Sequence, residues 1–160
     1  MSVRKTFVSL LYDEMALCND LVIITGDLGY NILDNIRKDF PDRFYNVGAA
    51  EQLMLGVGVG MALDKKIPVC YSFTPFLLCR SYEWIRNYVD HDVIPVKLAG
   101  VGRSDEYDWL GFSHWATNDE KYMSGFDRIV KLWPKDAEEM KLQFHRIIHD
   151  PLPYYINLSR

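Results

Sequence analysis

The chain has 160 residues, of which 49% are hydrophobic and 25% are charged, and its net charge is −4. These values are typical of one globular domain with its own core, and an acidic chain without a basic stripe is not expected to bind nucleic acid. No apolar run approaches the roughly 20 residues of a membrane span, and the three cysteines show no disulfide or zinc spacing, so we expect reduced thiols and a cytoplasmic location.

Helical and strand patterns alternate along the chain. It opens with a helical period over residues 3–18, and a short β-branched run at 21–25 then predicts a buried strand. Five further strands are predicted at residues 44–47, 67–73, 93–100, 129–133 and 154–158. Between the strands, helices are expected at residues 32–40, 51–63, 77–89, 118–123 and 137–149.

This alternation predicts an α/β fold in one domain over residues 1–160. The expected architecture is a three-layer α/β/α sandwich around a mostly parallel six-stranded sheet. Ligands of such sheets collect at the carboxyl ends of the strands. Four loops are expected at that edge, and they span residues 26–29, 48–51, 74–76 and 101–117.

The helix expected at residues 51–63 has an unusual composition. It begins with one acid, Glu51, carries no other charge and contains Gly56, Gly58 and Gly60. Each helical glycine costs about 1 kcal/mol relative to alanine, so we expect another helix, a partner subunit or a flat ligand to lie close to the backbone. An acid in a first helical turn often only complements the helix dipole. Among glycines and aliphatic residues, however, Glu51 is expected to be poorly hydrated, which favours a protonated carboxyl able to hydrogen-bond a ring nitrogen.

The other loops at this edge also carry candidate binding residues. Phe73 and Phe76 flank Pro75 after a predicted strand, and they either pack in the core or form a stacking platform for a flat ring. Asp27 follows the first strand and is either a turn former or a site residue. His114 lies beside aromatic residues in the longest loop, where a structural role and a functional role both stay open.

Several segments together resemble the pyrimidine-binding domain of the transketolase-like thiamine diphosphate enzymes. The most specific segment is Asn46-Val-Gly-Ala-Ala-Glu-Gln, and Phe73-Thr-Pro-Phe and Gly111-Phe-Ser-His support it. The resemblance covers nearly the whole chain, from residues 27–28 to the closing residues 153–160. It implies the thiamine diphosphate-binding fold.

The resemblance implies two catalytic residues. In the family, the acid matching Glu51 bonds the pyrimidine ring nitrogen of thiamine diphosphate and promotes the tautomer that activates this cofactor. His114 matches a histidine that contacts the oxygens of the sugar substrate in transketolases.

The resemblance also implies cofactor-binding residues besides Glu51. Residues matching Phe73 and Phe76 line the aminopyrimidine pocket of the family. Asp27 and Leu28 match a turn that lies near the thiazolium ring.

The diphosphate-binding domain of the family has no counterpart in this sequence. Its Gly-Asp-Gly pattern with a downstream Asn is not matched at residues 26–29, no acidic cluster is suited to Mg²⁺, and the family's C-terminal domain is not expected either. We therefore expect no metal ligand in this chain. The resemblance implies a split enzyme, in which a separate diphosphate-binding subunit holds Mg²⁺ or Ca²⁺. An α2β2 assembly with self-association of this chain is the expected arrangement.

Two departures from the family pattern concern the substrate. Leu110 stands where transketolases carry an acid that reads a substrate hydroxyl, and Phe76 and Arg80 are one residue farther apart than usual. Arg103, in the longest loop, could meet a substrate phosphate, although a solvated position is the favoured interpretation.

Three functions therefore stay open. The leading interpretation is a transketolase-like subunit that transfers a two-carbon ketol unit between sugars or sugar phosphates. The second is a subunit of a two-component 2-oxoacid decarboxylase or acyloin synthase. The third is a non-catalytic subunit that binds and regulates a partner, but the retention of Glu51, Phe73 and Phe76 argues against it.

Overall fold

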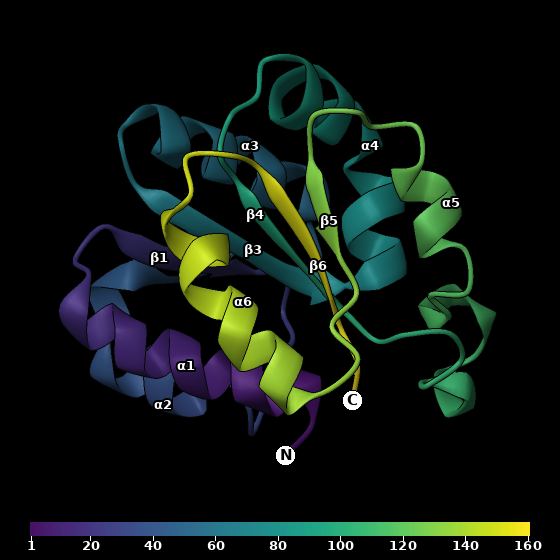
Figure 1. Ribbon diagram of the computed structural model, residues 1–160, viewed down its shortest axis with the longest axis horizontal. Helices are drawn as coiled ribbons and strands as arrows, with labels where there is room; N and C mark the ends of the chain where they lie inside the picture. The colour runs from purple at the N-terminus through teal and green to yellow at the C-terminus, as the bar shows by residue number, and fades with distance from the viewer.

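The computed structural model describes residues 1–160 and contains one six-stranded sheet (Figure 1). All neighbouring strands pair in parallel, in the order β2-β1-β3-β4-β6-β5. The strands are β1 (Leu21–Thr25), β2 (Phe44–Asn46), β3 (Ile67–Phe73), β4 (Lys97–Val101), β5 (Val130–Leu132) and β6 (Tyr154–Leu158). The predicted α/β fold is confirmed, and the sheet is wholly rather than mostly parallel.

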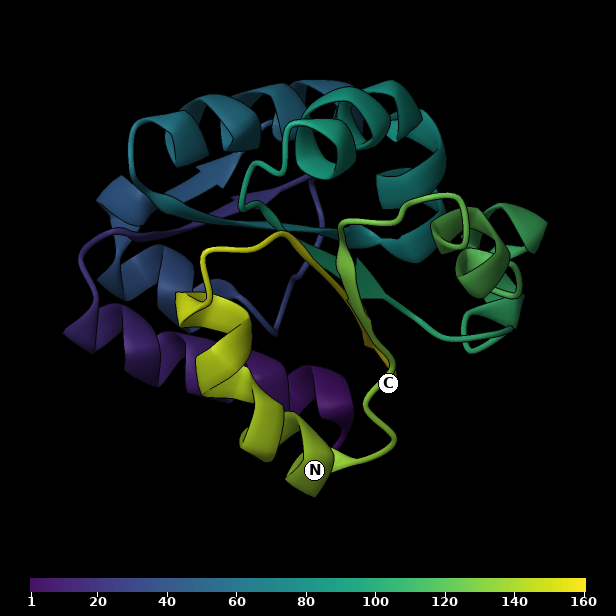
Figure 2. The same cartoon turned by 45° about the horizontal axis from the view of Figure 1, so that its top comes forward.

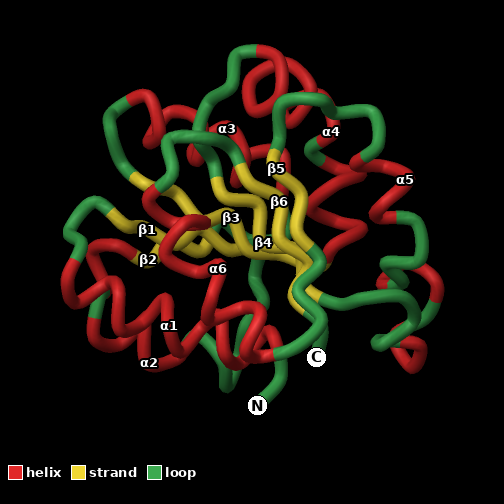
Figure 3. Tube along the Cα trace, in the orientation of Figure 1, coloured by secondary structure: helices red, strands yellow, loops and turns green.

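Helices cover both faces of the sheet, as Figure 2 shows. One face carries α1 (Val3–Leu17), α2 (Asp34–Asp39) and α6 (Ala137–His149), and the other carries α3 (Glu51–Leu63) and α4 (Tyr82–Trp84). The short α5 (Asp119–Met123) lies within the long segment between β4 and β5, which projects at the right of Figure 3. None of the helices combines the length and hydropathy that a membrane-spanning segment requires.

The sheet separates two hydrophobic cores. Successive side chains of a strand point to opposite faces, so Ile23 of β1 enters the core under α1 and α6, whereas Ile24 enters the core under α3. Tyr154 and Tyr155 of β6 divide between the two cores in the same way. Every residue of β1, β4 and β6 is buried, and these strands are mostly apolar, which is typical of a parallel sheet covered on both faces. Thr25, Lys97 and Asn157 are their buried polar residues.

Two predicted elements differ from the structure. The helix expected at residues 77–89 consists of a π-helix at Phe76–Arg80, the short α4 and a second π-helix at Ile85–His91. The strand expected from residue 93 begins only at Lys97, because Val93 has a φ of 57° and cannot continue an extended chain. The remaining boundaries agree within about two residues.

Candidate functional site

The loops that follow β1, β2, β3 and β4 meet at one edge of the molecule, because the carboxyl ends of parallel strands share an edge. Glu51 follows β2, Phe73 ends β3, and His114 lies in the loop after β4. Gly26, directly after β1, lies so close to Glu51 that a Cβ atom there would be 3.1 Å from Oε1. The structure therefore brings together the loops that the sequence singled out.

Glu51 is buried at the first turn of α3, with only 1% of its side chain exposed. Its Oε1 accepts a hydrogen bond of 2.9 Å from the Ser72 hydroxyl, and its Oε2 accepts one of 2.7 Å from Nη1 of Arg80. The burial of Glu51 agrees with the expectation, but its surroundings include two polar donors besides the glycines and aliphatic residues that the sequence indicated. Glu51 has one neutral donor and one cationic donor, and both come from residues far along the chain.

Three aromatic rings stand beside Glu51 and contact one another edge to face. The ring centroids of Phe73 and Phe76 are 5.7 Å apart, and His114 lies 4.9 Å from Phe73 and 4.8 Å from Phe76. Tyr107 contacts Phe73 at 4.9 Å. Both phenylalanines are only partly buried, so they are not simple core residues. We call Phe73, Phe76 and His114 the aromatic trio.

Asp27 and Leu28 lie on the other side of Phe73. Asp27 is exposed with a φ of 58°, and its carboxylate accepts hydrogen bonds from the Tyr30 hydroxyl at 2.9 Å and the Asn46 amide at 3.2 Å. The carboxylate of Asp27 is thus bonded by side chains and not by its own backbone, so neither the turn interpretation nor the site interpretation is decided by these contacts. Leu28 is partly buried and points into a hollow that also borders Asp27 and Phe73.

Two hollows flank the aromatic trio. The first, of about 320 Å³, is lined by Asp27, Leu28, Phe73 and Tyr71 among others. The second, of about 230 Å³, lies beyond Phe76 and is lined by aromatic residues of the long loop and α5, together with Arg80. These aromatic residues are Phe112, Trp115 and Tyr122. The trio therefore forms a wall with open space on each side.

The long loop that carries His114 is bonded to β6 at both ends. At its start, Arg103 donates to the side-chain oxygen of Asn157 at 2.9 Å and to the carbonyl of Pro134 at 3.0 Å. Arg103 is therefore neither the solvated residue that was favoured nor a free ligand for a phosphate. Leu110, the residue in place of the family acid, is exposed in the middle of this loop.

At the end of the loop, the buried carboxylate of Asp119 accepts three hydrogen bonds on one oxygen. The donors are Trp133 Nε1 at 2.8 Å, the Tyr155 hydroxyl at 2.8 Å and the Asn157 amide at 2.9 Å. Burial, followed by the neighbouring Asp119 charge, raises the pKa of Tyr155 well above its usual value, so this hydroxyl stays a donor. Asp119 and Arg103 thus share Asn157 and fix the span that presents His114.

The glycines of α3 have different surroundings. A Cβ at Gly58 would lie 2.7 Å from the sulfur of Cys70 on β3, and one at Gly56 would lie 3.3 Å from the ring of Trp84 in α4. Close approach was predicted correctly at these two positions, and a helix was among the expected neighbours, but a strand side chain was not. Gly60 has nothing within 4 Å and faces outward.

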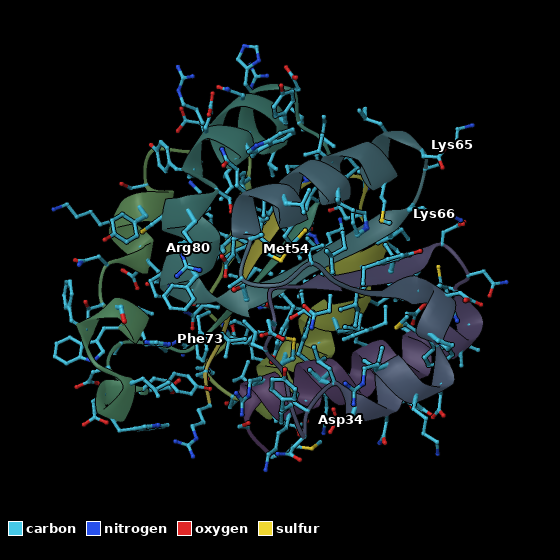
Figure 4. The ribbon with its side chains drawn as sticks, turned by 180° about the vertical axis from the view of Figure 1, so that it is seen from behind. Asp34, Met54, Lys65, Lys66, Phe73 and Arg80 are labelled. Carbon is cyan, nitrogen blue, oxygen red and sulfur yellow. The ribbon has the colours of Figure 1, made fainter.

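Sequence reasoning missed the two partners of Glu51. Ser72 is the penultimate residue of β3, and Arg80 ends the first π-helix, which also places its Cζ 3.9 Å from the centroid of Phe76. In Figure 4, Arg80 and Phe73 lie on the same side of the molecule. The only signal was the extra residue between Phe76 and Arg80, because a π-helix accommodates one additional residue.

A second buried charge lies at the opposite edge of the sheet. Lys97 begins β4, is 1% exposed, and donates to the carbonyls of Asp150 and Leu152, each at 2.7 Å. Burial lowers its pKa to about 8, against the usual value of 10.5.

A polar hollow of about 630 Å³ is lined in part by residues 86–88 and 90–92, before β4, and contains none of the predicted site residues. In residues 1–160, no three His, Cys, Asp or Glu side chains are placed to hold a metal ion.

Comparison with known proteins identifies the family. The sequence pattern described as the transketolase pyrimidine-binding domain matches residues 1–160. The chain belongs to this family. The predicted resemblance to the pyrimidine-binding domain is thereby confirmed.

Relatives of this pyrimidine-binding domain include parts of transketolases. A putative transketolase C-terminal section of Methanocaldococcus jannaschii is 30% identical over 159 residues, which are 99% of this chain and 50% of that protein. One of the subunits of an apulose-4-phosphate transketolase of Actinobacillus succinogenes is 35% identical over 122 residues, which are 76% of this chain and 39% of that relative.

A solved structure described as a split gene transketolase, in an inactive beta4 tetramer, has the same fold as this pyrimidine-binding domain. The TM-score is 0.87 at 27% identity, and the match covers 100% of this chain and 52% of that one. The chain therefore spans about half the length of the relatives that it matches across its whole length.

Proposed function

We propose that this chain is the pyrimidine-binding subunit of a two-component, thiamine diphosphate-dependent transketolase. The enzyme would move a two-carbon ketol unit between sugars or sugar phosphates. The observation that carries the proposal is the buried carboxyl of Glu51 at the start of α3, in a chain whose whole length matches the pyrimidine-binding domain. A relative named as a subunit of an apulose-4-phosphate transketolase supports the class of reaction.

The residues present fit half of a thiamine diphosphate site. Glu51 supplies a carboxyl, and the absence of a side chain at Gly26 leaves space beside it that a Cβ atom would reduce. Phe73 and Phe76 supply aromatic faces for the same site. When bound, the cofactor supplies an electron sink for cleavage of the ketol bond. Glu51 would hold and release a proton at the pyrimidine nitrogen, and its burial would exclude water from that proton.

The other predicted residues are assigned to the neighbouring parts of the site. Asp27 and Leu28 would border the thiazolium ring from the turn after β1, next to the hollow of about 320 Å³. His114 would contact sugar oxygens, and its ring contacts with Phe73 and Phe76 support its assignment to the same site.

A separate subunit would supply the diphosphate-binding half of the site. Residues 1–160 contain no cluster of metal ligands, so Mg²⁺ or Ca²⁺ would be held by the partner. The outward side of α3 offers an uncharged surface for association, with Leu53 and Leu63 exposed and Gly60 between them. In an α2β2 complex, this chain would contact both the partner subunit and a second copy of itself.

Reconstitution tests this proposal. The chain is mixed with candidate partners that contain the diphosphate-binding pattern, thiamine diphosphate and Mg²⁺, and ketol transfer from a ketose phosphate to an aldose is measured. We expect turnover only when both chains are present. Turnover by the isolated chain would refute the shared site.

The two alternatives predict different results in the same assay. A 2-oxoacid decarboxylase or acyloin synthase would release carbon dioxide from a 2-oxoacid donor and would leave the ketose phosphate unchanged. A regulatory subunit would change the partner's activity without any requirement for Glu51. We also propose a cytoplasmic location, because Cys18, Cys70 and Cys79 are free thiols.

A further inference from the structure

Arg80 makes two contacts with residues that the proposed function assigns to the pyrimidine ring. Its Nη1 donates to Oε2 of Glu51 at 2.7 Å, and its Cζ lies 3.9 Å from the centroid of the Phe76 ring. A guanidinium is planar and carries N–H donors in the plane. Arg80 therefore covers an aromatic face and bonds the carboxyl at the same time, as a bound aminopyrimidine would.

The carboxyl of Glu51 offers little access from its other side. Oε1 accepts a hydrogen bond of 2.9 Å from the hydroxyl of Ser72, which is itself fully buried in β3. Glu51 itself is almost fully buried. A ring nitrogen must therefore approach through Oε2, which is the oxygen that Arg80 occupies.

We propose that Arg80 is an internal occupant of the pyrimidine site, which the cofactor ring displaces when it binds. This inference rests on the proposed function, since it concerns the same carboxyl. The two occupants exclude each other at Oε2. Nη1 of Arg80 donates to Oε2, and a ring nitrogen that bonded Glu51 would need the same oxygen.

Arg80 can leave while Glu51 stays in place. The Arg80 side chain is 45% exposed, against 1% for Glu51. It also borders the hollow of about 230 Å³ beyond Phe76, so its guanidinium has space to move into. The contact thus joins a buried acid to a partly exposed cation, whose guanidinium also lies on the partly buried ring of Phe76.

The consequence is a reduced affinity of the unliganded chain for the cofactor ring. A site that is open in only a fraction of molecules binds more weakly by that fraction. The same contact gives Glu51 a partner before the cofactor is present, which avoids a buried carboxylate without compensation. Arg80 therefore stabilises the empty subunit and opposes loading.

Binding of two probes to the full chain tests the inference. The probes are the free hydroxymethyl aminopyrimidine that forms half of thiamine, and thiamine diphosphate with Mg²⁺. Affinity is measured by calorimetry, and the Arg80 side chain is followed by NMR of nitrogen-labelled arginine. We expect either probe to shift the Arg80 signal, and we expect Arg80→Ala to bind about tenfold tighter than the wild type.

Matched variants separate the possible causes. Arg86→Ala removes the same charge from the second π-helix, where Arg86 bonds only Asn87, and should bind like the wild type. Arg80→Lys keeps a cation near Glu51 but has no plane to cover Phe76, so its gain should be smaller than that of Arg80→Ala. Circular dichroism confirms that each variant is folded, and the lysine variant preserves the test if the alanine variant is not.

The outcomes distinguish the inference from the function on which it rests. Unchanged or weaker binding by Arg80→Ala, with binding still lost in Glu51→Ala, would overturn the role of Arg80 and leave the pyrimidine site intact. If binding does not depend on Glu51 in any background, or if the opened Arg80→Ala site binds neither probe, both proposals are wrong.

Discussion

Glu51 and Lys97 are both about 1% exposed, yet the molecule treats these two buried charges differently. Lys97, at the start of β4, donates to two backbone carbonyls that cannot move without the fold. Glu51, at the carboxyl edge, is bonded to a half-exposed arginine that ends a π-helix. Lys97 thus has fixed neutral partners, whereas Glu51 has a partly exposed charged partner, which is the one that we infer the cofactor ring displaces.

The largest difference between Glu51 and Lys97 is expected in catalytic activity. In the reconstituted complex, Glu51→Gln should lower kcat by a factor of about 10² to 10⁴, because the amide cannot hold and release a proton at the ring. Lys97→Met should leave kcat of the folded protein within about twofold, since no predicted site residue contacts it. Steady-state rates of both variants, with folded fractions measured by circular dichroism, provide the test. Full activity of Glu51→Gln would favour a regulatory role.

The pH dependence of the unfolding free energy should, in contrast, reveal the contribution of Lys97. The pKa of Lys97 is about 8 when folded and 10.5 when unfolded, so between these values the unfolded chain binds a proton that the folded chain lacks. The Lys97 contribution therefore becomes more favourable as pH rises from about 8 to about 10. Relative to Lys97→Met, the wild type should gain about 2 kcal/mol of unfolding free energy over this range. Urea unfolding of both proteins at the two ends of the range measures the difference, and a constant difference would contradict it.

The position of Glu51 depends on how closely α3 lies on the sheet. Substitutions at two glycines of this helix test that dependence. Gly58→Ala should cost about 1–3 kcal/mol, because the new Cβ would meet the Cys70 sulfur at 2.7 Å. Gly60→Ala, on the open side of the same helix, should instead stabilise the isolated chain by about 0.5–1 kcal/mol. Thermal melts of the two variants provide the measurement. Equal effects would mean that close packing does not set the place of α3.

Much of the fold could be predicted because its signals are local. Apolar runs such as residues 21–25 mark buried strands, and an uncharged helix that opens with one acid indicates a buried Glu51. The partners of that acid could not be predicted, because Arg80 reaches it only through the backbone geometry of a π-helix 29 residues later. Arg103 was misjudged for a similar reason, since its acceptors lie on β6 and before α6, far along the chain.

Because Arg103 and Asp119 both bond Asn157, the segment between them is attached to β6 at both ends. Between these two attachments, Glu106 accepts a hydrogen bond from the backbone of Arg103 and Tyr107 is buried against Phe73. The exposed large side chains of this segment are Trp109, Leu110, Phe112 and Trp115. A library randomised at the exposed Trp109, Leu110 and Phe112 would therefore be a practical starting point for changing the acceptor of the proposed reaction by directed evolution. The bonds of Arg103 and Asp119 to Asn157 would keep each new sequence at the carboxyl edge of the sheet.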